Sequence, residues 1–150
     1  MLKKILLSGM IISCIINVVP SFAIETSRNI EETFNDGSYF ETELEVIESK
    51  TTNTKSGKKT ASFKDSSGKT MWSITVEGTF KYTGTSATCT KSFGNSISYV
   101  SYWKLEKATA TNSGNTASAK TTGRRYSAFI CVETIPKTVT LSCDKNGKLV

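Results

Sequence analysis

Apolar and polar residues alternate with a period of two along much of this chain. In residues 72–82 every second position is apolar or glycine, and the positions between them are polar or charged. Successive side chains of a strand point to opposite faces, so this pattern predicts a strand with one buried face. A helix would distribute the same aromatic residues around its circumference. Gly78, on the apolar side, predicts a bulge or a close approach by another part of the chain.

Residues 40–46 alternate in the same way, with glutamates at every second position. Phe40, Leu44 and Ile47 also fit one stripe of a helix, so the segment has two interpretations. We favour a strand, because glycine and serine precede the segment and threonine-rich sequence follows it. Residues 25–36 are predicted to form a short helix or an arm.

Further strands are predicted over residues 97–105 and 138–143, and weaker ones over residues 87–91 and 117–121. Residues 129–135 are a denser apolar run, which is typical of a central strand buried on both faces. Turn residues separate these segments at Asn35–Ser38, Ser56–Gly57, Ser66–Gly68, Thr83–Thr85, Gly94–Ser96, Ser113–Asn115 and Asn146–Gly147.

The spacing of these turns predicts an all-β fold. We expect a single antiparallel β-sandwich of about seven or eight strands, immunoglobulin-like in general architecture, preceded by a signal-peptide helix. The sandwich domain is predicted over residues 39–150, after an acidic N-terminal arm over residues 24–38.

The first 23 residues have the layout of a secretory signal peptide. Lys3 and Lys4 precede an apolar run, and small residues lie before the bond between Ala23 and Ile24. We therefore predict cleavage after Ala23 and a secreted, extracellular protein, with retention at the cell surface as an alternative. Two other interpretations are a retained transmembrane anchor and a lipid attached at Cys14.

Cleavage would leave three cysteines, which export allows to form a disulfide. Their spacing cannot select the pair, and an odd number leaves one thiol free or bound to another molecule. The chain of 150 residues contains no histidine. Catalysis by Ser-His-Asp or Cys-His groups is therefore excluded. We predict no catalytic residue, metal ligand or cofactor, and hence a protein that is not an enzyme.

The net charge of +6 is unevenly distributed. Residues 25–48 carry eight acids and one arginine, whereas residues 49–150 carry sixteen basic and five acidic residues. Glu41, Glu43 and Glu45 would lie on one face of a strand, so neighbouring basic strands are expected to compensate them. A basic face could bind an anionic partner. Its candidate residues are Lys50, Lys55, Lys58, Lys59, Lys64, Lys69, Arg124 and Arg125.

Three stretches resemble a group of uncharacterised small secreted proteins of Gram-positive, clostridia-like bacteria. They are residues 72–84, 85–90 and 139–147. In that group the two cysteines of these stretches occur together. The resemblance therefore implies a disulfide between Cys89 and Cys143, with Cys131 as the free or alternative thiol. It implies a compartment and a class of protein, and no activity.

These observations predict a non-catalytic extracellular binding module. Its candidate partners are an anionic cell-wall polymer or another surface protein. Nothing in the sequence indicates nucleic acid, and a membrane is expected only through the signal peptide. The alternative is a secreted membrane-active or antimicrobial protein, since the strands of pore-forming hairpins also alternate small polar and apolar residues.

Overall fold

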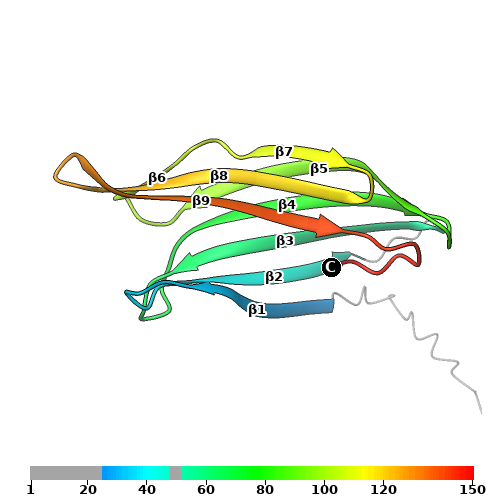
Figure 1. Ribbon diagram of the computed structural model, residues 1–150, viewed down its shortest axis with the longest axis horizontal. Coiled ribbons are helices and arrows are strands. Elements are labelled where there is room, and N and C mark those ends of the chain that lie inside the picture. Colours follow the sequence, from blue (N-terminus) through cyan, green and yellow to red (C-terminus); the bar gives the residue numbers. More distant parts are fainter. Residues whose placement is uncertain (1–24, 48–51) are drawn as a thin grey trace, which may run out of the picture.

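Two antiparallel sheets pack face to face to form a β-sandwich (Figure 1). The computed structural model describes residues 25–47 and 52–150, which form nine strands and no helix. The predicted fold class is confirmed. The predicted signal peptide, its cleavage bond between Ala23 and Ile24, and Cys14 and Lys50 lie outside the described residues.

The first sheet is a meander in which each strand pairs with the next one along the chain. Its strands are β1 (Glu25–Thr33), β2 (Tyr39–Ile47), β3 (Thr54–Lys64), β4 (Thr70–Tyr82) and β5 (Ala87–Ser98). The predicted strand over residues 72–82 is β4, and the ambiguous segment after residue 39 is β2. The predicted turns at residues 35–38, 66–68 and 83–85 connect these strands.

The second sheet is centred on one strand, β8. Its strands are β6 (Trp103–Leu105), β7 (Thr109–Ser113), β8 (Thr116–Ser127) and β9 (Ile130–Ser142). One edge of β8 pairs with β9 along its whole length. The other edge of β8 pairs with β7 near its start and with β6 near its end. Because β8 has only two edges, β6 and β7 act as one interrupted strand.

The core lies between the sheets and contains the apolar side of the alternating segments. Trp72, Ile74 and Val76 of β4 are fully buried, as the period of two predicts. The rings of Phe40, Phe63, Trp72 and Trp103 pack with centroids 5.2–5.9 Å apart. The second sheet contributes small and aliphatic residues, namely Ala117, Ala119, Val139 and Leu141.

The acidic stretch near the N-terminus differs from its prediction, because residues 25–33 form a strand and not a helix or an arm. β1 pairs with β2 along its length, and this pairing supplies hydrogen bonds that a free arm would lack. Ile30 is exposed, whereas Phe34, which follows β1, packs against the rings of Phe40 and Phe63. The predicted strand over residues 97–105 is also divided. Residues 99–102 turn between β5 and β6, and the Ser98 hydroxyl donates to the main-chain oxygens of Val100 and Trp103.

Two predicted turns are wrong, because Gly57 and Gly94 lie inside β3 and β5. A Cβ on Gly57 would lie 2.5 Å from a Leu149 methyl carbon, and one on Gly94 would lie 3.0 Å from the Ala119 Cβ. These glycines permit close approach of the other layer and do not form turns. The predicted close approach at Gly78 is confirmed, since a Cβ there would lie 3.3 Å from the Ala117 Cβ of the other sheet.

Candidate functional site

The hairpin between β8 and β9 projects beyond the rest of the sandwich (Figure 1). It carries exposed apolar side chains. Its two turn residues, Ala128 and Phe129, have φ angles of 45° and 71°. Two-residue hairpin turns of this kind favour asparagine and glycine, and bulky residues are rare at positive φ. The Phe129 side chain is nevertheless 100% exposed.

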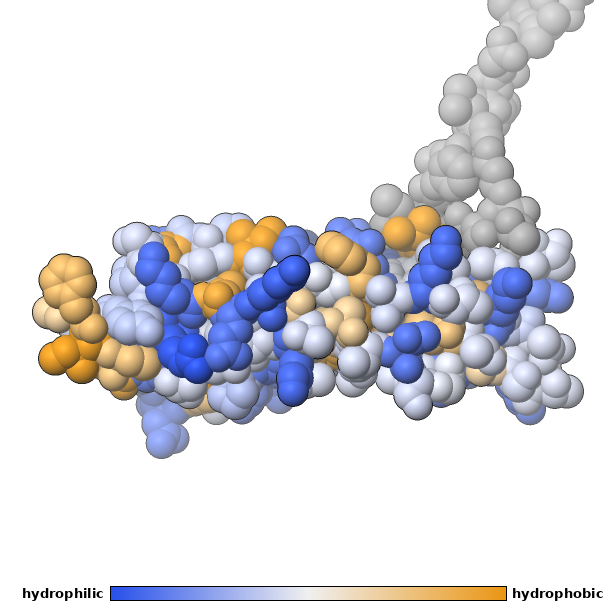
Figure 2. All heavy atoms as spheres, turned by 90° about the horizontal axis from the view of Figure 1, so that it is seen from above, coloured by the Kyte–Doolittle hydropathy of each residue, from blue (hydrophilic) through white to orange (hydrophobic). Residues whose placement is uncertain are grey.

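The prediction of a central strand buried on both faces over residues 129–135 is wrong, because β9 is an edge strand that pairs with β8 and buries one face. Phe129, Ile130 and Val132 are exposed, and burial begins only at Ile135. The hairpin extends past the end of β6, its neighbour in the same sheet, and it also projects beyond the facing sheet (Figure 1). We call residues 126–132 the hairpin tip, and Figure 2 shows this end of the molecule as a cluster of hydrophobic residues.

A bulge and an ion pair lie at the boundary between the hairpin tip and the rest of the sheet. Arg125 pairs with Glu133 in register, whereas Tyr126 pairs with Cys131, so Val132 is an extra residue of β9. Bulges change the direction of a strand locally. The Arg125 Nε donates to the Glu133 carboxylate at 2.7 Å.

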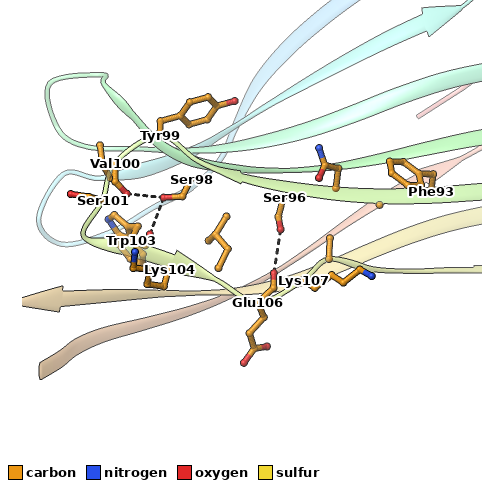
Figure 3. Close-up of a pocket in the computed structure, with 14 residues that line it drawn as sticks. Phe93, Ser96, Ser98, Tyr99, Val100, Ser101, Trp103, Lys104, Glu106 and Lys107 are labelled. Atoms are coloured by element: carbon orange, nitrogen blue, oxygen red, sulfur yellow. Dashed lines mark hydrogen bonds between the residues drawn. The ribbon is translucent and has the colours of Figure 1, made fainter. Parts of the chain in front are cut away.

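A groove of about 740 Å³ lies between β5 and the segment from β6 to residue 108 (Figure 3). Phe93, Tyr99 and Trp103 contribute aromatic surface to it. The Ser96 hydroxyl donates to the Glu106 main-chain oxygen at 3.2 Å across the groove. This hydrogen bond joins the two sides of the groove, whose lining exposes both polar and apolar groups.

Glu106 is the only carboxylate among the residues that line this groove. The Thr122 hydroxyl and the guanidinium of Arg124 lower its pKa, so the carboxylate is ionised at neutral pH. The Arg124 Nη2 lies 2.6 Å from the Glu106 carboxylate. A carboxyl group that acts as a general acid near neutral pH needs a raised pKa, so the lowered pKa of Glu106 does not favour that role.

The three glutamates of β2 are neutralised by basic residues on the neighbouring strands. Glu43 pairs with Arg28 of β1 at 3.0 Å, and Glu45 pairs with Lys58 of β3 at 3.0 Å. Glu41 pairs with Lys64 of β3. The expectation of compensating basic strands is confirmed for these residues.

The predicted anion-binding residues are distributed over both sheets. Lys55, Lys58, Lys59 and Lys64 belong to β3, Lys69 lies beside the β3–β4 turn, and Arg124 and Arg125 belong to β8. Lys58 and Lys64 share the glutamate-bearing outer face of the first sheet. Arg124 is on the outer face of the second sheet, since its neighbour Gly123 packs inward against Trp72. The structure therefore does not bring these seven residues together on one face. The binding of an anionic polymer stays a prediction.

Two of the three described cysteines are brought toward one turn. The Cys89 N–H donates to the Gly114 oxygen at 2.8 Å, and the Cys143 N–H donates to the Asn115 oxygen at 3.0 Å. All three thiols are free here, with Cys89 and Cys143 buried and Cys131 exposed. Burial raises the pKa of Cys89 and of Cys143. Their pairing in a disulfide stays a prediction.

Within residues 25–47 and 52–150, no group of three or more cysteine, aspartate or glutamate side chains is arranged to hold a metal ion. The same ranges contain no helix of the length and apolar character that crossing a membrane requires. Comparisons with protein-family models, with curated proteins and with solved structures give no match.

Proposed function

We propose that this protein is a non-catalytic extracellular binding module that contacts its partner through the hairpin tip. The observation that carries the proposal is Phe129, fully exposed on a turn where both central residues have positive φ. Locally unfavourable residues that persist at an exposed position are typical of functional surfaces. Asparagine or glycine would satisfy the turn better, so folding alone does not account for a phenylalanine there.

The surroundings of Phe129 also support a contact surface. Ile130 and Val132 extend the apolar area, and an exposed apolar cluster of this kind is uncommon on a protein that contacts nothing. β8 and β9 are long paired strands, which give the hairpin tip a rigid support. Export through residues 1–23 would place this surface outside the cell.

The hairpin supports a pore-forming activity less well than it supports a contact surface. A membrane-spanning strand needs about nine to eleven residues with an apolar band on its lipid side. The outward side chains of β8 are polar or charged, as its burial pattern shows for Ser118, Lys120 and Thr122. Apolar exposure is concentrated instead at the hairpin tip.

Retention on cells tests the proposal. The purified chain without residues 1–23 would be sedimented with intact Gram-positive cells and with protoplasts, as wild type, Phe129→Asn and Phe93→Ser. Asparagine tolerates positive φ, so Phe129→Asn keeps the turn and removes only the ring. Phe93 is a matched control, because it is also exposed but lies on β5, away from the hairpin tip.

We expect at least a tenfold loss of retention for Phe129→Asn and no loss for Phe93→Ser. A Phe129→Asn variant that folds and is retained as well as the wild type would contradict the proposed contact surface.

A further inference from the structure

We infer that the hairpin tip docks into the interface of a lipid membrane and buries its apolar side chains among the headgroups and upper acyl chains. This inference rests on the proposed function and specifies the partner of the same surface. The choice of a lipid is argued from the charge, depth, main-chain pairing and aromatic residues of the hairpin.

The hairpin tip is free of charged side chains over its whole length. Residues 126–132 read Tyr-Ser-Ala-Phe-Ile-Cys-Val. The nearest charges along the strands are Arg125 and Glu133, which neutralise each other in an ion pair. Entry of this segment into an apolar environment therefore removes no isolated charge from water, which would be the largest opposing cost.

The length of the uncharged segment matches the depth of a membrane interface. The ion pair lies three to four residues from the turn, and a strand rises about 3.3 Å per residue, so the uncharged part is about 10 Å deep. Apolar groups of interfacial proteins penetrate about 5–10 Å into the boundary between headgroups and acyl chains. At that depth the Arg125–Glu133 pair would remain among the headgroups.

The main chain of the hairpin is also suited to a medium without water. Ser127 pairs with Ile130 and Tyr126 with Cys131, so the two strands stay paired up to the two-residue turn. An unpaired N–H or C=O group costs several kcal/mol in hydrocarbon, and a closely paired hairpin presents few of them.

Two tyrosines lie at the base of the hairpin tip. The Tyr126 N–H donates to the Tyr102 main-chain oxygen at 2.9 Å, which places the chain around Tyr102 beside the hairpin. The Tyr102 side chain is itself exposed, and its hydroxyl donates to the Met71 sulfur at 3.1 Å. Tyrosine is enriched at membrane interfaces, because it combines an apolar ring with a polar hydroxyl.

Shape and charge favour a lipid surface over a protein pocket. The hairpin tip is convex and protrudes from one end of the molecule, so it needs a partner that it can enter (Figure 2). A lipid interface accepts such a protrusion without a preformed cavity. Without residues 1–23 the chain carries 17 basic and 13 acidic residues, and this net charge of +4 would also draw the protein toward anionic lipids over a longer range.

Cosedimentation with protein-free lipid vesicles tests this inference. Vesicles of phosphatidylcholine alone and of phosphatidylcholine with phosphatidylglycerol would be mixed with the chain without residues 1–23, as wild type, Phe129→Asn and Phe93→Ser. We expect the wild type to bind both kinds of vesicle, and to bind the anionic vesicles more strongly. Binding should be at least tenfold weaker for Phe129→Asn and unchanged for Phe93→Ser.

The Phe129→Trp variant measures how deeply the hairpin tip enters the lipid. Its emission should shift to the blue and be quenched by lipids brominated near the headgroup, whereas Trp72 and Trp103 are buried and should not respond.

Two results would overturn the inference. Equal vesicle binding by wild type and Phe129→Asn would mean that general positive charge binds the lipid. Absence of wild-type binding to vesicles, together with Phe129-dependent retention on cells, would assign the hairpin tip to a surface protein or wall component and leave the proposed function standing. If Phe129 matters in neither assay, both proposals fail.

Discussion

The ammonium group of Lys137 lies 4.2 Å from the centroid of the Phe40 ring. Lys137 belongs to β9 and Phe40 to β2, so this cation–π contact joins the two sheets at the side where β1 and β9 are edge strands. Glu31 and Glu32 of β1 each lie 3.4 Å from the same ammonium group. The register of β1 shifts at Glu31, so a bulge supplies one of these carboxylates.

This contact predicts a graded response to substitution at Lys137, whose side chain is only 10% exposed. Lys137→Ala should destabilise the fold by about 2–3 kcal/mol, because it removes both the packed stem and the charge that compensates two glutamates. Lys137→Met keeps the stem over Phe40 and should cost about 1 kcal/mol less. Urea denaturation measures the free energy of unfolding for each variant. Equal values for the two would show that the stem contributes nothing.

The packing around Gly123 predicts that a larger side chain at this position destabilises the fold. A Cβ at this position would lie 2.9 Å from the Trp72 ring and 3.2 Å from the Trp103 ring. Gly123→Ala should therefore destabilise the fold by about 1–3 kcal/mol, as overpacking of a core does. It should also change the near-ultraviolet circular dichroism of the tryptophans. Gly84→Ala is a useful comparison, since no atom would lie within 4 Å of its Cβ but its φ is +85°. That variant should lose stability through backbone strain and leave the tryptophan signal unchanged.

The strands that could be predicted are those in which apolar and polar residues alternate within a single segment of the chain. Residues 72–82 alternate strictly, and β4 buries the predicted side between the sheets. The interior glycines could not be assigned, because Gly57 and Gly94 are required by Leu149 and Ala119, which are distant in sequence. The same holds for the hairpin tip. Phe129, Ile130 and Val132 have the composition of a central strand, and only the end of the facing layer leaves them exposed.

One sequence feature could have indicated the hairpin tip. The run after Tyr126 contains no turn residue such as glycine, asparagine or proline, although β8 and β9 are long enough to need a turn between them. Dense apolar sequence therefore extends through a reversal of the chain. A turn made of apolar residues is unusual, and exposed apolar clusters are more typical of interaction surfaces than of other parts of a protein surface.

Hydrogen-bonded carboxylates in three turns predict that the fold loses stability at low pH. The Ser67 hydroxyl and the Lys69 N–H lower the pKa of Asp65 below its usual 3.8, and the N–H groups of Lys148 and Asn146 lower that of Asp144 in the same way. The Ser38 hydroxyl lowers the pKa of Asp36. Because the folded pKa is below the unfolded value, these bonds stabilise the protein above about pH 4, and their contribution is lost as the pH falls through the folded pKa.

The urea midpoint should therefore decrease between pH 5 and pH 2. Asp144→Asn should decrease this dependence, because asparagine does not titrate and its side-chain oxygen still accepts a hydrogen bond. An unchanged pH dependence in this variant would show that Asp144 does not contribute to acid sensitivity.

The disulfide implied for Cys89 and Cys143 predicts how the oxidised protein differs from its reduced form. Both cysteines donate their N–H groups to successive oxygens of the β7–β8 turn, which places them at the same end of the sandwich. Oxidation would transfer two electrons and two protons to a disulfide oxidant such as oxidised glutathione. The bond would close a loop of about 54 residues and add about 3–4 kcal/mol to the free energy of unfolding. Peptide mapping under non-reducing conditions identifies the linked residues, and Cys143→Ser is the matched variant without the bond.

In the reduced protein, a maleimide should modify Cys131 first, because Cys89 and Cys143 are buried and burial raises their thiol pKa. A linkage that includes Cys131 in place of Cys89 would contradict the pairing, since it would join the hairpin tip to the opposite end of β9.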